Sequence, residues 1–142
     1  MNYWILALPI IAGLLTQLIK VIVEIFRGDF SWHVLKKYGG MPSSHSAFVF
    51  GLLAEIAYLD GFFSTTFAIA LILTILIVRD ATGYRRTMDR HAKMINQLVK
   101  ELPGKEQIDF PYLDEIMGHT PSQVAVGGLL GIIIVIIGNL LI

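Results

Sequence analysis

The sequence lacks cysteine and carries few charged residues. Without cysteine, neither disulfides nor thiol chemistry is available to the protein. Charged residues make up only 15% of the chain, and 11 Lys and Arg residues balance 11 Asp and Glu residues. A net charge of zero provides no positive field for nucleic acid, so we expect no nucleic-acid partner. What the chain has instead is apolar length, because 55% of its residues are hydrophobic.

The hydrophobic residues gather in long runs. A membrane-spanning helix needs about 20 apolar residues, and about 17 is the lower limit. Three runs contain no charged residue, and they are Tyr3–Ile19, Phe62–Val78 and Ser122–Ile142. A fourth run, Ser46–Leu59, holds Glu55 and reaches spanning length if its helix begins near Pro42. We therefore predict an all-α polytopic membrane protein with about four transmembrane helices, forming a single domain over residues 1–142.

The cations lie in only two segments of the chain. One extends from Lys20 to Lys37 and the other from Arg79 to Lys105. With four spans, both segments are on the same side of the membrane. Cytoplasmic loops are enriched in Lys and Arg, so we expect an integral protein of a bacterial plasma membrane with both basic loops in the cytoplasm and both termini outside.

The second basic segment also contains an amphipathic pattern. Apolar residues recur at helical spacing over Arg86–Leu102, with cationic residues elsewhere around the helix. This pattern predicts an amphipathic helix lying on the cytoplasmic interface. Two acidic residues, Glu55 and Asp80, lie in or at the edge of a span, and for each we expect a salt bridge with an arginine.

Two polar stretches stand where apolar helices begin. The first reads GGMPSSHS from Gly39 to Ser46, and the second reads GHTPSQ from Gly118 to Gln123. A helix N-terminus presents unpaired N–H groups to an anion. Ser43 and Ser44 can cap the helix or donate hydrogen bonds to an oxyanion. Both stretches lie at the same side of the predicted bundle, which is where we expect the chemistry.

Each stretch contributes one histidine, His45 and His119. Two histidines beside a phosphate-sized anion can divide the work, one attacking phosphorus and the other protonating the leaving oxygen. Cations that suit phosphate are nearby in the sequence: Lys20, Arg27, and Arg85 or Arg86. A well-capped turn explains the first stretch equally well, and the first two cations are also typical of interfacial anchors.

The combination of motifs resembles the type 2 phosphatidic acid phosphatase and vanadium haloperoxidase superfamily, in its short, divergent branch. The first motif of that superfamily is similar to Lys20-VIVEIF-Arg27, with Gly28 in place of a proline. The second, Pro-Ser-Gly-His, is similar to Pro42-Ser43-Ser44-His45. The histidine of the third corresponds to His119 in the run HTPSQV.

The resemblance implies a role for each matching residue. Lys20 and Arg27 would hold phosphate oxygens, together with Ser43 and Ser44. His45 would be the general acid for the leaving alcohol. The resemblance further implies that a phosphohistidine forms on the nucleophile, His119.

The chain departs from the superfamily pattern in the third motif. Gln123 stands where a carboxylate would orient His119, and an amide can hold the ring without supplying charge. Tyr112 and Leu113 occupy the Ser-Arg positions, so Arg85 or Arg86 would substitute for that arginine. An alternative alignment makes His91 the nucleophile, but no proline follows it.

The sequence thus predicts a membrane-embedded phosphatase acting on a lipid phosphate or diphosphate, with membrane lipids and a phosphorylated lipid or small phosphate as partners. No metal or other cofactor is expected, because cations and helix ends can carry the oxyanion charge. The alternative is a non-catalytic membrane protein that uses the same pocket to bind lipid headgroups or phosphate. A homodimer would add helices to a bundle of four.

Overall fold

The computed structural model describes residues 3–26, 28, 40–103 and 110–142, and all its regular structure is helical. This confirms the predicted all-α class. The elements in chain order are α1 (Trp4–Phe26), α2 (Ser44–Asp60), α3 (Thr65–Arg79), the π-helical turn η2 (Asp80–Tyr84), α4 (Arg85–Glu101) and α5 (Pro121–Leu141).

Within the part of the chain that the structure describes, three helical segments are long and apolar enough to cross a membrane: Trp4–Phe26, the apolar part of the continuous helix Thr65–Glu101, and Pro121–Leu141. The helix α2 has 17 residues and lies at the lower limit of spanning length. It is nevertheless the central helix, because it packs against α1, α5 and α3. The structure therefore fits a membrane protein with about four spans.

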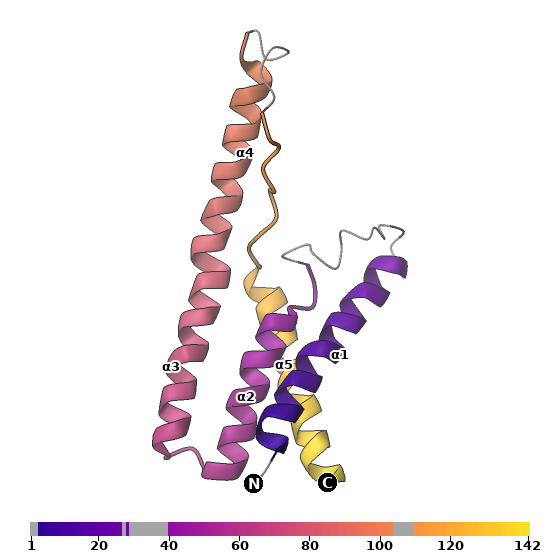
Figure 1. Cartoon of the computed structure of the whole chain (residues 1–142), viewed down its shortest axis with the longest axis vertical. Helices are drawn as coiled ribbons and strands as arrows, with labels where there is room; N and C mark the ends of the chain where they lie inside the picture. The colour runs from indigo at the N-terminus through magenta and orange to yellow at the C-terminus, as the bar shows by residue number, and fades with distance from the viewer. Residues whose placement is uncertain (1–2, 27, 29–39, 104–109) are drawn as a thin grey trace.

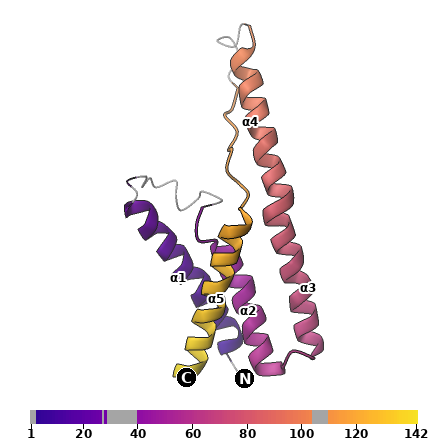
Figure 2. The same cartoon turned by 180° about the vertical axis from the view of Figure 1, so that it is seen from behind.

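The helices alternate in direction. In Figure 1, α1 and α3 run upward while α2 and α5 run downward, so both termini lie at one end. The starts of α2 and α5 lie together at the other end, as the reverse view in Figure 2 also shows. The two helix starts that carry histidines are therefore at the same end of the bundle.

Glycine allows α5 to approach α2 closely. A methyl group on Gly127 would overlap the carbonyl oxygen of Ser43, and one on Gly131 would overlap that of Ala47. Small residues at such contacts let helix backbones meet in membranes, where lipid provides little hydrophobic drive for association. The buried apolar cluster beside this contact consists of Leu8, Ala12 and Val135.

The two acidic residues of the spans have different partners. Asp80 accepts a hydrogen bond from Arg85 Nε at 2.8 Å, which confirms the predicted ion pair. Glu55 is fully buried, and its carboxylate accepts instead from the side-chain amide of Asn139 on α5. The prediction of an arginine partner for Glu55 was therefore wrong. An amide donor can satisfy this oxygen without bringing a second charge into the bundle.

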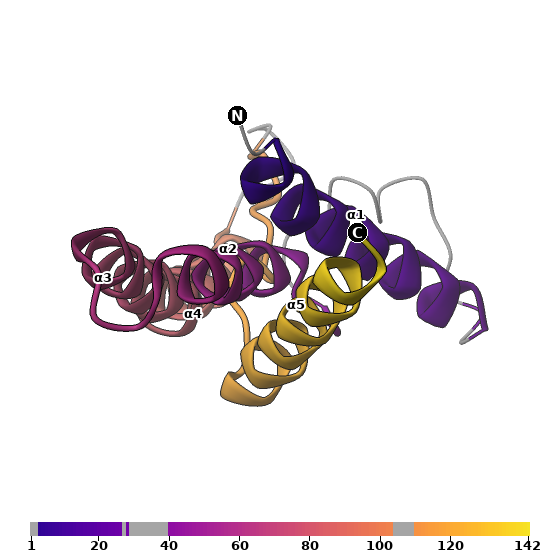
Figure 3. The same cartoon turned by 90° about the horizontal axis from the view of Figure 1, so that it is seen from below.

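The amphipathic helix is present but continues α3. α3, η2 and α4 form one rod that extends beyond the other helices (Figure 1), and α3 stands beside α2 on the side away from α1 (Figure 3). We expected α4 to lie on the membrane interface. It instead prolongs the axis of α3 because the segment 110–120 packs along one of its sides, held by hydrogen bonds to Asn96.

The glycine contacts predict a selective loss of stability. We expect Gly131→Ala to destabilise the protein by about 1–3 kcal/mol, because the added methyl group meets backbone that must shift. The matched control is Gly83→Ala, where a new Cβ has nothing within 4 Å and helix propensity favours alanine. Thermal unfolding in detergent measures both variants, and equal midpoints for the two would contradict the close-approach argument.

Candidate functional site

The starts of α2 and α5 are joined through the backbone. Ser43 caps α2, and its N–H donates to the carbonyl of Gln123 in the first turn of α5 at 3.3 Å. The Ser43 hydroxyl oxygen accepts hydrogen bonds from the N–H and the hydroxyl of Ser46, at 3.3 and 2.9 Å. Ser43 is 1% exposed. Its hydroxyl oxygen is thus engaged in capping, and its backbone pins one helix start to the other.

The start of α5 is a capping box. Thr120 accepts a hydrogen bond from the N–H of Gln123 at 3.3 Å, and the side-chain oxygen of Gln123 accepts from the N–H of Thr120 at 2.9 Å. Pro121 occupies the first turn, where it has no N–H to leave unpaired. This arrangement stabilises the helix start directly after His119. The side-chain oxygen of Gln123 therefore belongs to the cap, and its predicted role in orienting the histidine stays a prediction.

The two histidines lie side by side at these helix starts. The ring centroids of His45 and His119 are 6.4 Å apart, and the rings meet edge to face at 71°. His45 is exposed at the beginning of α2, whereas His119 is buried. The Nδ1 atom of His119 is buried and has no hydrogen-bond partner among the described residues. Nε2 is therefore the ring nitrogen through which His119 can act.

The segment that carries His119 is fastened to α4 at several points. We call residues 110–120 the return segment, because in Figure 1 it runs back along α4 towards the bundle. The Asn96 side chain donates to the carbonyl of Leu113 at 2.9 Å and accepts from its N–H at 3.1 Å. The same amide donates to Glu115, which also accepts from the hydroxyl of Tyr112. The residues at the Ser-Arg positions of the superfamily motif thus contact α4 rather than the histidines.

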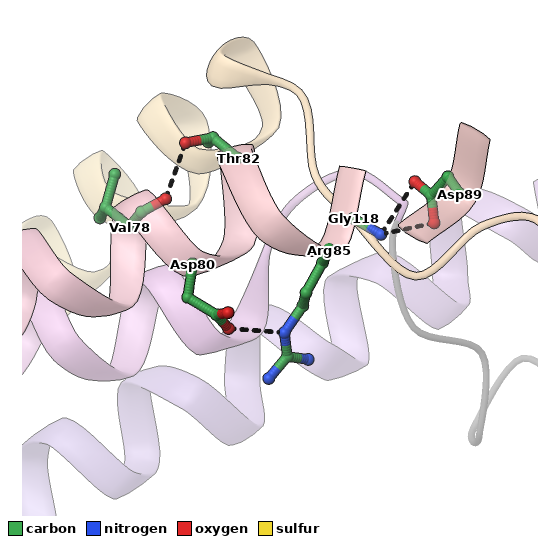
Figure 4. A network of polar contacts seen from close by, with 6 residues as sticks. All are labelled: Val78, Asp80, Thr82, Arg85, Asp89 and Gly118. Atoms are coloured by element: carbon green, nitrogen blue, oxygen red, sulfur yellow. Dashed lines mark hydrogen bonds and ion pairs between the residues drawn. The ribbon is translucent and has the colours of Figure 1, made fainter. Parts of the chain in front are cut away.

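Asp89 makes the second attachment, nearer to the site. Its carboxylate accepts a hydrogen bond from the backbone N–H of Met117 at 2.6 Å. It also accepts from the N–H of Gly118 at 3.1–3.2 Å, as Figure 4 shows. A Cβ on Gly118 would lie 2.6 Å from the backbone nitrogen of Arg86, so only glycine lets the return segment approach α4 here. Hydrogen bonds from N–H groups to a carboxylate are stronger than those between neutral groups. Asp89 therefore fixes the two residues that precede His119.

The third attachment uses the π-helical turn. In η2 the N–H of Arg85 bonds to the carbonyl of Asp80, five residues earlier instead of four. A π turn shifts the hydrogen-bond register, and such turns are frequent at functional sites. The carbonyl of Ala81, within this turn, accepts a hydrogen bond from the N–H of His119 at 3.0 Å. The irregular helix thus supplies the acceptor that holds the backbone of the buried histidine.

The environment favours the uncharged form of His119. Burial of the ring, the main cause, lowers its pKa to about 4. The charges of Lys20 and Arg85, and that of His45 when it is protonated, lower the pKa of His119 further. The carboxylate of Asp89 opposes the shift. Burial disfavours a charged imidazole, and neighbouring cations repel it, so His119 is neutral at neutral pH.

The predicted phosphate-binding cations differ in their burial and in their partners. Lys20 is buried at 4% exposure, and Gly40, with a φ of +94°, passes so close that a Cβ there would lie 2.7 Å from Lys20 Cε. Arg85 pairs with Asp80, as Figure 4 shows. Arg86 is exposed on α4. The fourth predicted cation, Arg27, lies outside the described residues.

Two further predicted site residues are Ser44, as a phosphate ligand, and His91, as the alternative nucleophile. The hydroxyl of Ser44 donates to the side-chain oxygen of Gln17 on α1 at 2.8 Å, so it links two helices. His91, the nucleophile of the alternative alignment, is exposed on α4. Among the described residues, no group of three or more His, Cys, Asp or Glu side chains could hold a metal ion. The site therefore consists of two imidazoles, two helix starts and neighbouring cations.

Sequence reasoning missed the residues that position the site. Asp89 and Asn96 are seven residues apart on α4, which places them two turns apart on one side of that helix. The small residue Ala92 lies between them and is also buried. This spacing of acidic, small and amide side chains was the available signal. It could not reveal what packed there, because the return segment has no periodicity of its own.

Comparison with known proteins agrees with the arrangement of helices and motifs. The fold and the paired helix starts define a polytopic membrane protein with two histidines at one end of its helix bundle. The chain belongs to the Divergent PAP2 family, which it matches over residues 1–134. It is 36% identical over 138 residues to the uncharacterized membrane protein YuiD of Bacillus subtilis (strain 168), covering 89% of this chain and 87% of that protein. No solved structure matches the chain.

The attachment at Asp89 predicts a specific effect of its removal. We expect Asp89→Ala to loosen the return segment and destabilise the protein by about 1–3 kcal/mol, because two backbone N–H groups lose their acceptor. The control is Asp114→Ala, which removes an exposed carboxylate from the same segment. Thermal unfolding and limited proteolysis of the return segment report the two effects. If Asp114→Ala is as damaging as Asp89→Ala, the positioning role is wrong.

Proposed function

We propose that this PAP2-related membrane protein is a phosphatase that hydrolyses a lipid phosphate or diphosphate through a phosphohistidine. The observation that carries the proposal is the contact of the His45 and His119 rings, 6.4 Å apart at two helix starts joined through the backbone. A single phosphate group at this end of the bundle can reach both rings. Such a pair is the minimum needed for a nucleophile and a separate proton donor.

The reaction takes two steps. Nε2 of His119 attacks phosphorus, and an N–P bond forms while the P–O bond to the leaving group breaks. Protonated His45 gives its proton to the leaving oxygen. A water molecule then attacks the phosphohistidine, and neutral His45 accepts the proton of that water. The N–P bond breaks, its electrons return to His119, and inorganic phosphate leaves.

The charge distribution supports His119 as the nucleophile. His119 is neutral at neutral pH because its pKa is about 4, so its lone pair is available for attack without prior deprotonation. His45 is exposed and can exchange protons with water between the two steps. The charges of Lys20 and Arg85 lower the pKa of His119, and in this proposal the same charges stabilise the phosphate oxygens. No metal is needed in this scheme.

The position of the site supports the proposal of a lipid substrate. The helices below the site are apolar, and their outer surfaces carry exposed Ile and Leu side chains that suit lipid tails. A phosphate headgroup could then enter at the end of the bundle while its hydrocarbon chain stays in the bilayer. Membrane lipids and the phosphorylated lipid are the partners that this arrangement implies.

The direction of insertion is also part of the proposal. The described cations of both basic segments lie at the end of the bundle that carries the histidines, opposite the termini. By the positive-inside rule, we expect the site in the cytoplasm and both termini outside, in a bacterial plasma membrane. A reporter that is active only in the cytoplasm, fused after Ile142, should therefore be silent. A reporter inserted at Lys105 should be active, and the reverse pattern would overturn this orientation.

A specific observation favours the alternative function. Nδ1 of His119 is buried without a partner among the described residues, and the side-chain oxygen of Gln123 is used in the helix cap. A histidine nucleophile normally needs its second nitrogen held by an acceptor, which fixes the tautomer. A non-catalytic protein that binds lipid headgroups or phosphate in the same pocket does not need that acceptor.

Substitution of each histidine separates the two functions. We expect His119→Ala to abolish the release of phosphate from a panel of lipid phosphates, and His45→Ala to slow it by about 10²–10⁴-fold, the usual contribution of a general acid. The control is His91→Ala, which removes an exposed histidine from α4 and should leave the rate unchanged.

The assay uses purified full-length protein in detergent, with phosphate release and acid-labile phosphoprotein as readouts. Activity that survives both substitutions would overturn the phosphohistidine mechanism. Binding of the same lipids without turnover by the wild-type protein would assign the alternative function instead.

A further inference from the structure

One surface of α4 remains apolar although the helix extends beyond the bundle. Five large apolar side chains on this surface are 46–69% exposed, and His91 among them is exposed as well. The return segment does not cover this surface, because it packs on the side of Ala92 and Asn96. We call this surface the α4 seam. It begins at Tyr84, the last residue of η2, and ends at Leu102, directly after α4, and between them it includes Met88, His91, Ile95 and Leu98.

The spacing of the seam is that of a coiled coil. Successive members are four, three, four, three and four residues apart. Residues repeated in this way lie along one line of a helix and pack against the same line of a second helix. An apolar stripe of this kind requires a partner when it faces water.

The length of the helix places the seam beyond the lipid. The continuous helix Thr65–Glu101 has 37 residues, which corresponds to about 55 Å at a rise of about 1.5 Å per residue. A bilayer core is about 30 Å thick, and α3 with η2 already spans that distance. α4 is also held upright against the return segment by Asn96 and Asp89, so it does not lie flat on the membrane. The seam therefore projects into water.

We propose that the α4 seam pairs with the same seam of a second copy of this chain in a parallel two-helix coiled coil. Copies inserted in one membrane share the same orientation, so their seams lie parallel and at the same height. The pairing places each residue opposite its own equivalent, and like charges there would repel. From Thr87 to Val99 the positions that flank the seam are uncharged. Charged residues flank it only at its ends, at Arg85 and Glu101.

α3 also leaves most of its apolar surface exposed below the seam. Only 11% of the most apolar part of the helix Thr65–Glu101 is buried, and the exposed residues there include Ile69, Ile72 and Leu76. Two parallel rods can therefore remain side by side below the seam. Lys93, in the middle of α4, is exposed on a different side of the helix from the seam.

Cysteine crosslinking tests the proposal cleanly, because the chain has no cysteine of its own. Met88→Cys and Leu98→Cys place thiols in the seam, where equivalent positions of a parallel pair come within the Cα separation that a disulfide tolerates. Lys93→Cys is the matched control on the same helix. All three positions are exposed, so the substitutions should not disturb folding.

The experiment oxidises membranes that contain each variant and compares crosslinked dimer by non-reducing electrophoresis. We expect at least about five-fold more dimer from the two seam variants than from Lys93→Cys, because only the seam positions face their own equivalents. Equal crosslinking at all three positions, no crosslinking at the seam, or crosslinks to a different protein would overturn the proposal.

A second variant tests the same contact without relying on thiol reactivity alone. Ile95→Glu in the Met88→Cys background brings two carboxylates face to face, and we expect it to reduce the dimer several-fold. Lys93→Glu in that background also adds a carboxylate but on another side of α4, and it should leave the dimer unchanged. Unchanged crosslinking with Ile95→Glu would overturn the pairing. Neither outcome depends on phosphatase activity, so this proposal and the proposed function can fail separately.

Discussion

The close approach of α2 and α5 is the constraint on which the site depends. The N–H of Ser43 reaches the carbonyl of Gln123, and this contact is possible because Gly127 and Gly131 present no side chain to the backbone of α2. Two helix starts that are far apart in the sequence thereby become one polar end. His45 and His119 each lie within two residues of this junction or its caps, so their proximity follows from packing rather than from any direct attraction between the rings.

The second requirement is that the return segment arrives in a fixed position. It has no regular structure, so it takes its hydrogen bonds from the helix beside it: from the amide of Asn96, the carboxylate of Asp89 and the carbonyl of Ala81. These acceptors and donors follow one another along one side of the rod. The result is a buried histidine whose backbone N–H is held and whose Nδ1 has no hydrogen-bond partner among the described residues. Burial also keeps the imidazole neutral, because a charged ring there would lose its hydration.

Much of the fold could be predicted because hydrophobic runs and capping signals are local. The spans and the starts of α2 and α5 follow from apolar length and from the Ser, Thr and Pro residues that precede each run. Neither Asn139 as the partner of Glu55 nor Asp89 as the anchor of the return segment could be predicted, since each contact joins segments distant in the sequence. The continuation of α3 into α4 was also missed. The charges and apolar spacing of α4 suit a helix that lies on the membrane interface as well as one that continues α3. Only the packing of the return segment against α4 distinguishes these two arrangements.

The π-helical turn has a geometric consequence for the whole rod. In an uninterrupted α-helix, residues about 18 positions apart face the same way, so Thr74 of α3 and Ala92 of α4 would share one line. The additional residue in the turn rotates everything after it by about 100° relative to what precedes it. Thr74 and Ala92 are both buried, and the turn changes the angle between them from the one that a straight helix would give. A helical wheel drawn straight across residues 65–101 therefore misplaces the residues after the turn, among them Asp89 and Asn96, which hold the return segment.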